Sequence, residues 1–260
     1  MKIKYYQIDA FITEKPFSGN PAGVCILDEW LPDEILQSIA FENNLAETAF
    51  VIPKTDHYDL RWFTPTIEMD LCGHATLAPA YLIMNVLEPK LNEVKFISNS
   101  GELIAKKDES RIEINFPSRP PIKSSPMKGL VESIGLEPIS VFKSRDYLFL
   151  YDNEEQIKSI NPDMMKLSQI DCFAVIVTAK GEKCDFVSRF FAPSAGVPED
   201  PVTGSAHSTL IPFWAERLSK NSLYARQISQ RGGELFCKHQ NNRALMAGKC
   251  KIYFEGNISI

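Results

Sequence analysis

The sequence predicts an α+β fold of two pseudo-symmetric lobes, each a mixed or antiparallel β-sheet wrapped around a central helix. Three observations support this prediction: a motif that occurs twice, a proline-rich segment between its copies, and a long apolar helix after each copy. The regular alternation of strands and helices that is typical of a Rossmann fold is absent. Short strands dominate instead.

The repeated motif begins at two arginines. The segment from Arg61 reads RWFTPTIEMDLCGHATLA, and the segment from Arg189 reads RFFAPSAGVPEDPVTGSAHSTL. Each copy opens with an arginine, two aromatic residues, a small residue and a proline, then passes an aspartate before a Gly-polar-Ala sequence. The similarity continues upstream through two apolar strands and a short helix that opens at Pro-Asp. We therefore interpret the chain as two halves that share the same succession of structural elements.

The central helices are expected directly after the glycine of each copy, at residues 74–87 and 205–218. Both segments are apolar on most faces, which is typical of a helix enclosed by its own sheet rather than one on the surface. The other segments alternate in hydrophobicity or form short apolar runs, which indicates strands. We expect these strands within residues 4–12, 23–27, 48–54, 59–65, 93–116, 173–180, 186–193, 227–239, 243–248 and 250–256.

The boundary between the halves is marked by composition. Residues 117–126 read PSRPPIKSSP, with four prolines and three serines, and such a segment is typical of an extended linker. We predict an N-terminal lobe over residues 1–118 and a C-terminal lobe over residues 126–260. For the last strand two positions stay open: it belongs either to the C-terminal lobe or, by returning, to the N-terminal lobe.

Composition narrows the class of function. The 260 residues carry a net charge of -5 with a pI near 5.5, which excludes a general binder of nucleic acid. The chain has no G-x-G-x-x-G or P-loop sequence for a nucleotide, and no apolar run long enough to span a bilayer. Six cysteines without a C-x-x-C pair and four scattered histidines predict no metal site. We expect a cytoplasmic protein without nucleic-acid or membrane partners.

Each glycine turn places the start of a helix in front of a potential ligand. The free N–H groups and the dipole of a helix start attract an anion, and a glycine allows close approach to the backbone. Two halves related by a pseudo-twofold axis would direct both helix starts at one cleft, which could hold a small carboxylate. Alternatively, His74 and Ser205 are ordinary helix-start residues. The different polar residues in the two copies favour a site.

Four motifs together resemble one known family. They are FSGNPAGVCIL (17–27), NLAETAFV (44–51), DLCGHATLA (70–78) and EDPVTGSAHS (199–208), and in this order they resemble the PhzF-like, phenazine-biosynthesis isomerase family over nearly the whole chain. The resemblance implies a fold similar to that of diaminopimelate epimerase, with the active site between the lobes. It also implies proton transfer within a small anionic substrate, without metal or cofactor, by a homodimer. The best-known members act on a dihydroaromatic amino acid.

The same resemblance implies roles for individual residues. Glu47 would be the single acid/base, and its apolar neighbours are compatible with the burial that tunes such a group. His74 would hydrogen-bond the substrate or its developing enol, Asp200 would bind an amino or hydroxyl group, and Ser205 would assist at the second helix start. Further contacts with the substrate are expected from Asn20, Gly73, Ala75, Thr203, Gly204 and Ala206.

Each of these residues also has a structural interpretation. A glutamate that opens a strand is commonly solvated, and Asp200 before a proline is typical of a turn. His74 could be satisfied by the backbone, and Asn20 before a proline is expected to have a structural role beside any contact with ligand.

Two other functions stay open from the sequence. Related racemases and epimerases use two opposed cysteines, each before the glycine of a helix start. Here Cys72 precedes Gly73, but Thr203 precedes Gly204, so symmetric two-thiol chemistry is disfavoured. A Cys72-dependent epimerase or dehydratase of an amino or hydroxy acid remains an alternative, as does a non-catalytic small-molecule-binding protein. We expect a cofactor-independent isomerase of a small amino- or hydroxy-carboxylate, whose identity the sequence does not name.

Overall fold

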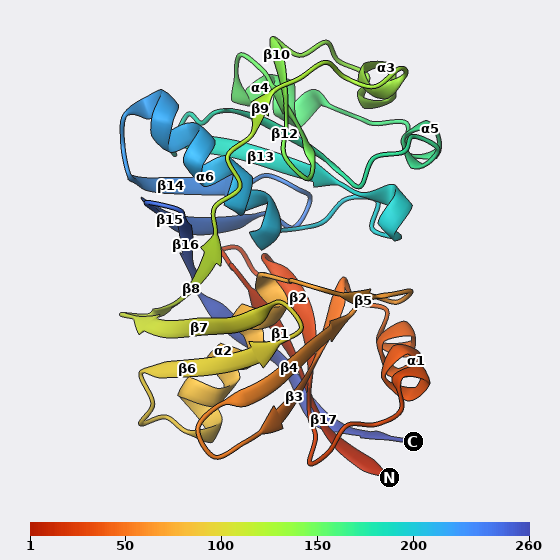
Figure 1. Cartoon of the computed structure of the whole chain (residues 1–260), viewed down its shortest axis with the longest axis vertical. Helices are drawn as coiled ribbons and strands as arrows, with labels where there is room; N and C mark the ends of the chain where they lie inside the picture. The colour runs from red at the N-terminus through yellow and green to blue at the C-terminus, as the bar shows by residue number, and fades with distance from the viewer. The chain divides into compact units, whose positions relative to one another are not determined.

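The computed structural model describes all residues from Met1 to Ile260 (Figure 1). The chain divides into two compact units: unit 1 comprises Met1–Phe116 and Leu245–Ile260, and unit 2 comprises Pro117–Ala244. The proline-rich segment thus belongs to unit 2, and unit 2 ends earlier than the expected boundary at residue 260. The C-terminal residues return to unit 1. No helix is both long and apolar enough to cross a membrane.

Unit 1 contains a mixed sheet. Its elements are β1 (Lys2–Ala10), β2 (Asn20–Ile26), α1 (Asp33–Asn43), β3 (Glu47–Pro53), β4 (Tyr58–Phe63), β5 (Glu68–Met69), α2 (His74–Leu82), the π-helical turn η1 (Ile83–Leu87), β6 (Glu93–Ser98), β7 (Gly101–Asp108), β8 (Arg111–Pro117) and β17 (Cys250–Ser259). Strand β1 lies between β2 and β17 and is antiparallel to both. Strand β3 is parallel to β2 and antiparallel to β4, and β4 is parallel to β6. Strands β6, β7 and β8 form an antiparallel meander.

Unit 2 repeats this order of elements. They are β9 (Ile122–Lys123), α3 (Leu130–Ile134), β10 (Ser140–Lys143), β11 (Tyr147–Leu150), α4 (Glu154–Ser159), α5 (Met164–Ser168), β12 (Val175–Lys180), β13 (Phe186–Phe191), η2 (Pro193–Ala195), α6 (Gly204–Leu218), β14 (Ser222–Gln227), β15 (Gly233–Gln240) and β16 (Arg243–Gly248). The last of these strands crosses the boundary between the units.

The strand pairings confirm the predicted pseudo-symmetry. In unit 2, β10 is antiparallel to β11, helices α4 and α5 lead to the parallel strand β12, and β13 is antiparallel to β12. Helix α6 then leads to β14, which is parallel to β13 and forms a hairpin with β15. Unit 1 has the same succession with α1 and α2 as its crossovers. The predicted fold class, an α+β structure with two pseudo-symmetric lobes, is therefore confirmed.

The long helix of each half is enclosed as its composition predicts. Every residue of α2 except Tyr81 is buried, and α6 is buried without interruption from Ala206 to Ala215. Helix α2 contacts β1, β2, β3 and β17, whereas α6 contacts β14 and β15. Because these helices have no polar face, only a position against their own sheet removes their apolar side chains from water.

The repeated arginines stabilise the loops that precede the helices. Arg61 on β4 forms a two-point ion pair with Glu68, with N···O distances of 2.7 and 2.8 Å. Arg189 on β13 pairs in the same way with Glu199, at 2.7 and 3.0 Å. Each guanidinium also lies over the aromatic ring two residues later, at 5.1 and 4.9 Å from the ring centroid. The shared start of the two motifs thus serves the fold rather than the chemistry.

His207 in α6 is a structural histidine. It is completely buried beside the ring of Phe186, and its Nδ1–H donates to the carbonyl of Thr203 at 2.8 Å. Thr76 at the same place in α2 bonds the carbonyl of Cys72, four residues earlier, in the same way. Burial lowers the pKa of His207 to about 4.

We expect His207 to weaken the protein in mild acid. Its pKa in the folded state lies below the value of about 6.5 in an unfolded chain, so the unfolded state gains the proton first as the pH falls. The free energy of unfolding should lose roughly 2 kcal/mol between pH 7 and pH 5 through this residue. Urea unfolding at both pH values, for the protein and for His207→Gln, measures the effect. Equal losses in the two proteins would show that the neutral imidazole is not the cause.

Candidate active site

The first half of the candidate site is built around Glu47 and His74. Glu47 is the first residue of β3, His74 is the first residue of α2, and the Oε2 and Nε2 atoms of the two side chains lie 3.1 Å apart. The His74 side chain is only 2% exposed and that of Glu47 13%. Neither of these two atoms has a well-aligned hydrogen bond, although they are buried. The contact is therefore an electrostatic one rather than a well-formed hydrogen bond.

Asn20 and Cys72 contact the other nitrogen of this histidine. The amide Nδ2 of Asn20 lies 3.1 Å from His74 Nδ1, and the Sγ atom of Cys72 lies 3.6 Å from the same nitrogen. An amide N–H can only donate, so when the imidazole is neutral Nδ1 accepts and the ring proton resides on Nε2. The Nε2–H then points toward Glu47.

The charges of this cluster depend on one another. Burial acts to lower the pKa of His74, but the nearby Cys72 and Glu47 favour the imidazolium more strongly, so the pKa is raised well above its usual value. Burial, together with the Glu47 carboxylate, raises the pKa of the Cys72 thiol to about 11. The thiol therefore stays protonated near neutral pH, and the charge that His74 meets there is that of Glu47.

Unit 2 has no acid at the position of Glu47. The repeated arginines face equivalent residues of the neighbouring strand, Phe50 in unit 1 and Val177 in unit 2. Glu47 lies three residues before Phe50, and Ala174 lies three residues before Val177. Ala174 is therefore the residue of unit 2 that corresponds to Glu47. The two halves therefore share a scaffold, and only one of them carries the carboxylate.

Asp200 is held in place by two neighbours in unit 2. Its Oδ2 atom accepts a hydrogen bond of 2.5 Å from the hydroxyl of Thr203. The amide of Gln227, at the end of β14, donates to that hydroxyl and to the carbonyl of Asp200, and it accepts from the backbone N–H of Thr203. Gln227 is 1% exposed. Sequence reasoning missed this residue because a single glutamine at a strand end has no diagnostic spacing.

Ser205 lies beside a second missed residue, Arg145. The Nη2 atom of Arg145 donates to Ser205 Oγ at 3.2 Å, and the guanidinium pairs with the buried carboxylate of Asp146 at 2.7 and 2.8 Å. The guanidinium also stacks over Phe173, 4.5 Å from the ring centroid. Because Ser205 Oγ accepts from Arg145, its own O–H is free to donate to another acceptor.

The remaining predicted residues lie at the two helix starts. Gly73 precedes α2, and Gly204 is the first residue of α6. Ala75 and Ala206 are at most 1% exposed, so their side chains are not available to a substrate and only backbone groups could serve. The structure thus assembles Asn20, Glu47 and His74 in unit 1, and Asp200 with Thr203 in unit 2.

The fold also forms a cluster that the sequence did not predict. One donor atom from each of Glu47, Cys72 and His74 lies within 4.8 Å of those of the other two. The prediction that the chain has no metal site stays a prediction, although these three side chains could together hold an ion. The sequence does not indicate this cluster, because Glu47 lies on β3, far along the chain from Cys72 and His74, which flank the glycine before α2.

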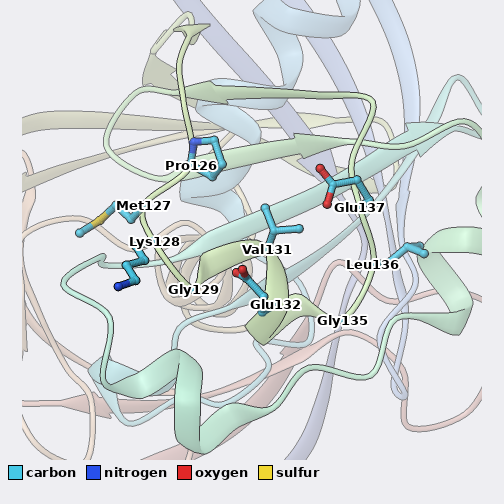
Figure 2. Close-up of a pocket in the computed structure, with 9 residues that line it drawn as sticks. All are labelled: Pro126, Met127, Lys128, Gly129, Val131, Glu132, Gly135, Leu136 and Glu137. Atoms are coloured by element: carbon cyan, nitrogen blue, oxygen red, sulfur yellow. The ribbon is translucent and has the colours of Figure 1, made fainter.

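A separate groove runs along α3 in unit 2 (Figure 2). It is lined by Pro126, Met127, Lys128, Gly129, Val131, Glu132, Gly135, Leu136 and Glu137. None of the predicted site residues lines this groove. It therefore contributes nothing to the candidate active site.

Comparison with known proteins agrees with the motifs. The family described as "Phenazine biosynthesis-like protein" (PhzC-PhzF) matches residues 8–256. The chain is 45% identical to an uncharacterized isomerase of Pseudomonas aeruginosa over the full length of both proteins. A solved PhzF-family protein of Enterococcus faecalis is 42% identical and superposes with a TM-score of 0.95, again over all of both chains.

More distant structures share the fold alone. A probable proline racemase of Agrobacterium radiobacter superposes with a TM-score of 0.68 at 10% identity, covering 99% of this chain and 93% of the other. The family match, the full-length relatives and the epimerase-like architecture agree with one another. The chain therefore belongs to the phenazine biosynthesis-like (PhzC-PhzF) family.

Proposed function

We propose that the protein is a cofactor-independent isomerase that moves a proton within a small amino- or hydroxy-carboxylate. The observation that carries this proposal is the asymmetry of the repeat: Glu47 faces His74 at 3.1 Å, and Ala174 stands at the equivalent position of the other half. A single carboxylate suits a reaction in which one base removes and returns the same proton. The name of the 45% identical relative, an isomerase, supports the same class of reaction.

The chemistry follows from the side chains at the first helix start. The Glu47 carboxylate takes a proton from a carbon of the substrate, so the C–H bond breaks, an O–H bond forms and the electron pair moves into an enol-like system. The Nε2–H of His74, which lies 3.1 Å from the Glu47 carboxylate, would donate a hydrogen bond to the oxygen on which charge develops. The carboxylic acid then returns the proton to a different carbon.

The second half would supply recognition. Asp200, oriented by Thr203 and Gln227, would bind an amino or hydroxyl group of the substrate. Ser205 would donate to a carboxylate oxygen, because its acceptor capacity is directed to Arg145. The guanidinium of Arg145, which is held by Asp146, would orient this hydroxyl toward the substrate.

A screen in heavy water tests the proposal and identifies the substrate in the same experiment. Small amino- and hydroxy-carboxylates, including dihydroaromatic ones, are incubated with the protein, and NMR follows loss or migration of carbon-bound hydrogen. A substrate found in this way is then deuterated at the donor carbon and converted in ordinary water. Because a buried base exchanges slowly with solvent, part of the label should appear at the acceptor carbon.

The second candidate is a Cys72-dependent epimerase or dehydratase. The contact of 3.6 Å between the Cys72 thiol and His74 favours it, since an imidazole can accept the thiol proton. Inversion at one carbon with no label retained would support this candidate against the single-carboxylate mechanism. Saturable binding without any exchange would instead indicate a non-catalytic binding protein.

We also propose that the protein is cytoplasmic and that it forms the homodimer that the family resemblance implies. Sedimentation equilibrium of the purified protein tests this assembly: a mass twice that of the 29.3 kDa chain is expected. A monomer over the whole concentration range would contradict it.

A further inference from the structure

Arg145 carries N–H groups that no other residue of the chain uses. A guanidinium has five such groups in one plane. The Nε and Nη2 groups donate to the two carboxylate oxygens of Asp146 at 2.8 and 2.7 Å, and Nη2 also donates to Ser205 Oγ at 3.2 Å. The two N–H groups of Nη1 donate to no residue of the chain. Because the Arg145 side chain is 27% exposed, a ligand can reach them.

The neighbours of Arg145 fix the direction of these free groups. The ion pair with Asp146 is made through two hydrogen bonds, and the side chain of Asp146 is only 2% exposed. The guanidinium also lies over Phe173, 4.5 Å from the ring centroid. Since the guanidinium is a rigid plane, Nη1 lies beside Nη2 and therefore close to Ser205. A single ligand oxygen could accept both from Nη1 and from the Ser205 hydroxyl.

The internal repeat has a similar contact in its other half. Strands β2 and β11 are equivalent, because each is the parallel neighbour of the strand that faces a repeated arginine. In this register Arg145 corresponds to the residue that follows Asn20. Asn20 contacts His74 at 3.1 Å, and Arg145 contacts Ser205, which occupies the place of His74 in the second copy. Each half therefore brings a donor from the beginning of a strand to the polar residue at a helix start.

We propose that Arg145 and Ser205 together bind a carboxylate group of the substrate through one of its oxygens. Both residues donate, so the bound atom must accept from both, and a carboxylate oxygen accepts more strongly than a neutral one. The ion pair with Asp146 neutralises the guanidinium, so hydrogen bonding rather than net charge selects the ligand. This inference rests on the proposed function, since it names the group by which the isomerase would hold its substrate. Arg145 is then a specificity-determining residue.

Binding of an unreactive ligand tests this site without turnover. The probe 2-hydroxybenzoate has a hydroxyl and a carboxylate, but no carbon-bound hydrogen that a carboxylate base could remove. Its amide, 2-hydroxybenzamide, has the same shape and no charge. In isothermal titration calorimetry the full-length protein should prefer the carboxylate. Arg145→Lys should weaken binding of the carboxylate by about tenfold or more, and binding of the amide by less, because a hydrogen bond to a neutral oxygen is weaker.

Two further variants separate recognition from a general loss of structure. Arg145→Lys keeps a cation for Asp146, and urea unfolding checks that it folds as the parent does. Arg217→Lys is the matched control: Arg217 is an exposed arginine in the last turn of α6 that also lies over a phenylalanine ring, at 4.6 Å, and its replacement should bind both ligands as the parent does. Ser205→Ala should also lower the preference for the carboxylate. The double variant Arg145→Lys, Ser205→Ala should lose less than the product of the two single effects, since both groups bind one oxygen.

The outcomes distinguish this site from the reaction. Equal losses for the carboxylate and the amide in Arg145→Lys, or no saturable binding of 2-hydroxybenzoate by the parent protein, would overturn the proposal. A preference for the carboxylate that Arg145→Lys removes and Arg217→Lys retains would uphold it. If that protein also exchanges no carbon-bound hydrogen in the heavy-water screen, the site stands and only the isomerase is rejected.

Discussion

Replacing Glu47 with glutamine should reduce turnover by about two to four orders of magnitude. The amide keeps the size of the side chain and its proximity to His74, but it cannot take a proton from carbon. The folded structure should be unaffected, because Oε2 makes no well-aligned hydrogen bond that the substitution would break. The initial rate of proton migration, with the substrate found in heavy water, measures the effect.

Cys72→Ser is the matched variant for this experiment. It changes a neighbour of the same histidine, 3.6 Å from Nδ1, and should cost much less activity because a thiol whose pKa is raised to about 11 is not the base at neutral pH. Transfer of deuterium between carbons should survive in Cys72→Ser and vanish in Glu47→Gln. The opposite ranking of the two variants would assign the reaction to the thiol.

Arg189→Met should lower the free energy of unfolding by about 3–5 kcal/mol. The Arg189 side chain is only 13% exposed. Its guanidinium holds Glu199 with two hydrogen bonds and also donates to the carbonyls of Ile157 and Ile160. Methionine fills much of the space but leaves a partly buried carboxylate and two carbonyls without this donor. Urea unfolding gives the free energy directly.

Arg61, in the first copy of the motif, is the residue with which Arg189 is compared. The hydrogen bonds of Arg61 go to the carboxylates of Glu68 and Asp33, and the Asp33 side chain is 74% exposed. Water can replace more of its partners, so Arg61→Met should destabilise the protein less than Arg189→Met. Equal losses, or a larger loss at Arg61, would mean that the backbone carbonyls held by Arg189 contribute little.

The fold class was predictable because it depends on patterns that repeat along the chain. The paired Arg-aromatic motifs and the apolar helices after them recur in the same order, and similar local sequences form similar strand-helix units. That Glu47 and His74 belong to one site was expected only through the family motifs. Their separation in the sequence is bridged by β3, β4 and the turn before α2, so no local rule connects them.

The residues that sequence reasoning missed share one property. Arg145 and Gln227 each act through a neighbour that is distant in sequence, Ser205 and Asp200 respectively, and neither belongs to a periodic or spaced motif. The close grouping of Glu47, Cys72 and His74 was missed for the same reason. Such contacts depend on strand register, which is set by long-range pairing and burial rather than by composition.

The return of β17 to unit 1 imposes an order on biosynthesis. Strand β1 is translated before unit 2, but its antiparallel partner over Lys2–Ala10 is β17, which is translated after all of unit 2. Until then one edge of β1 is an unpaired template for misassociation of the nascent chain. Unit 2 is continuous and can complete its core beforehand. It is an insertion in the sequence of unit 1, so the sheet of unit 1 can be completed only after unit 2 has been translated.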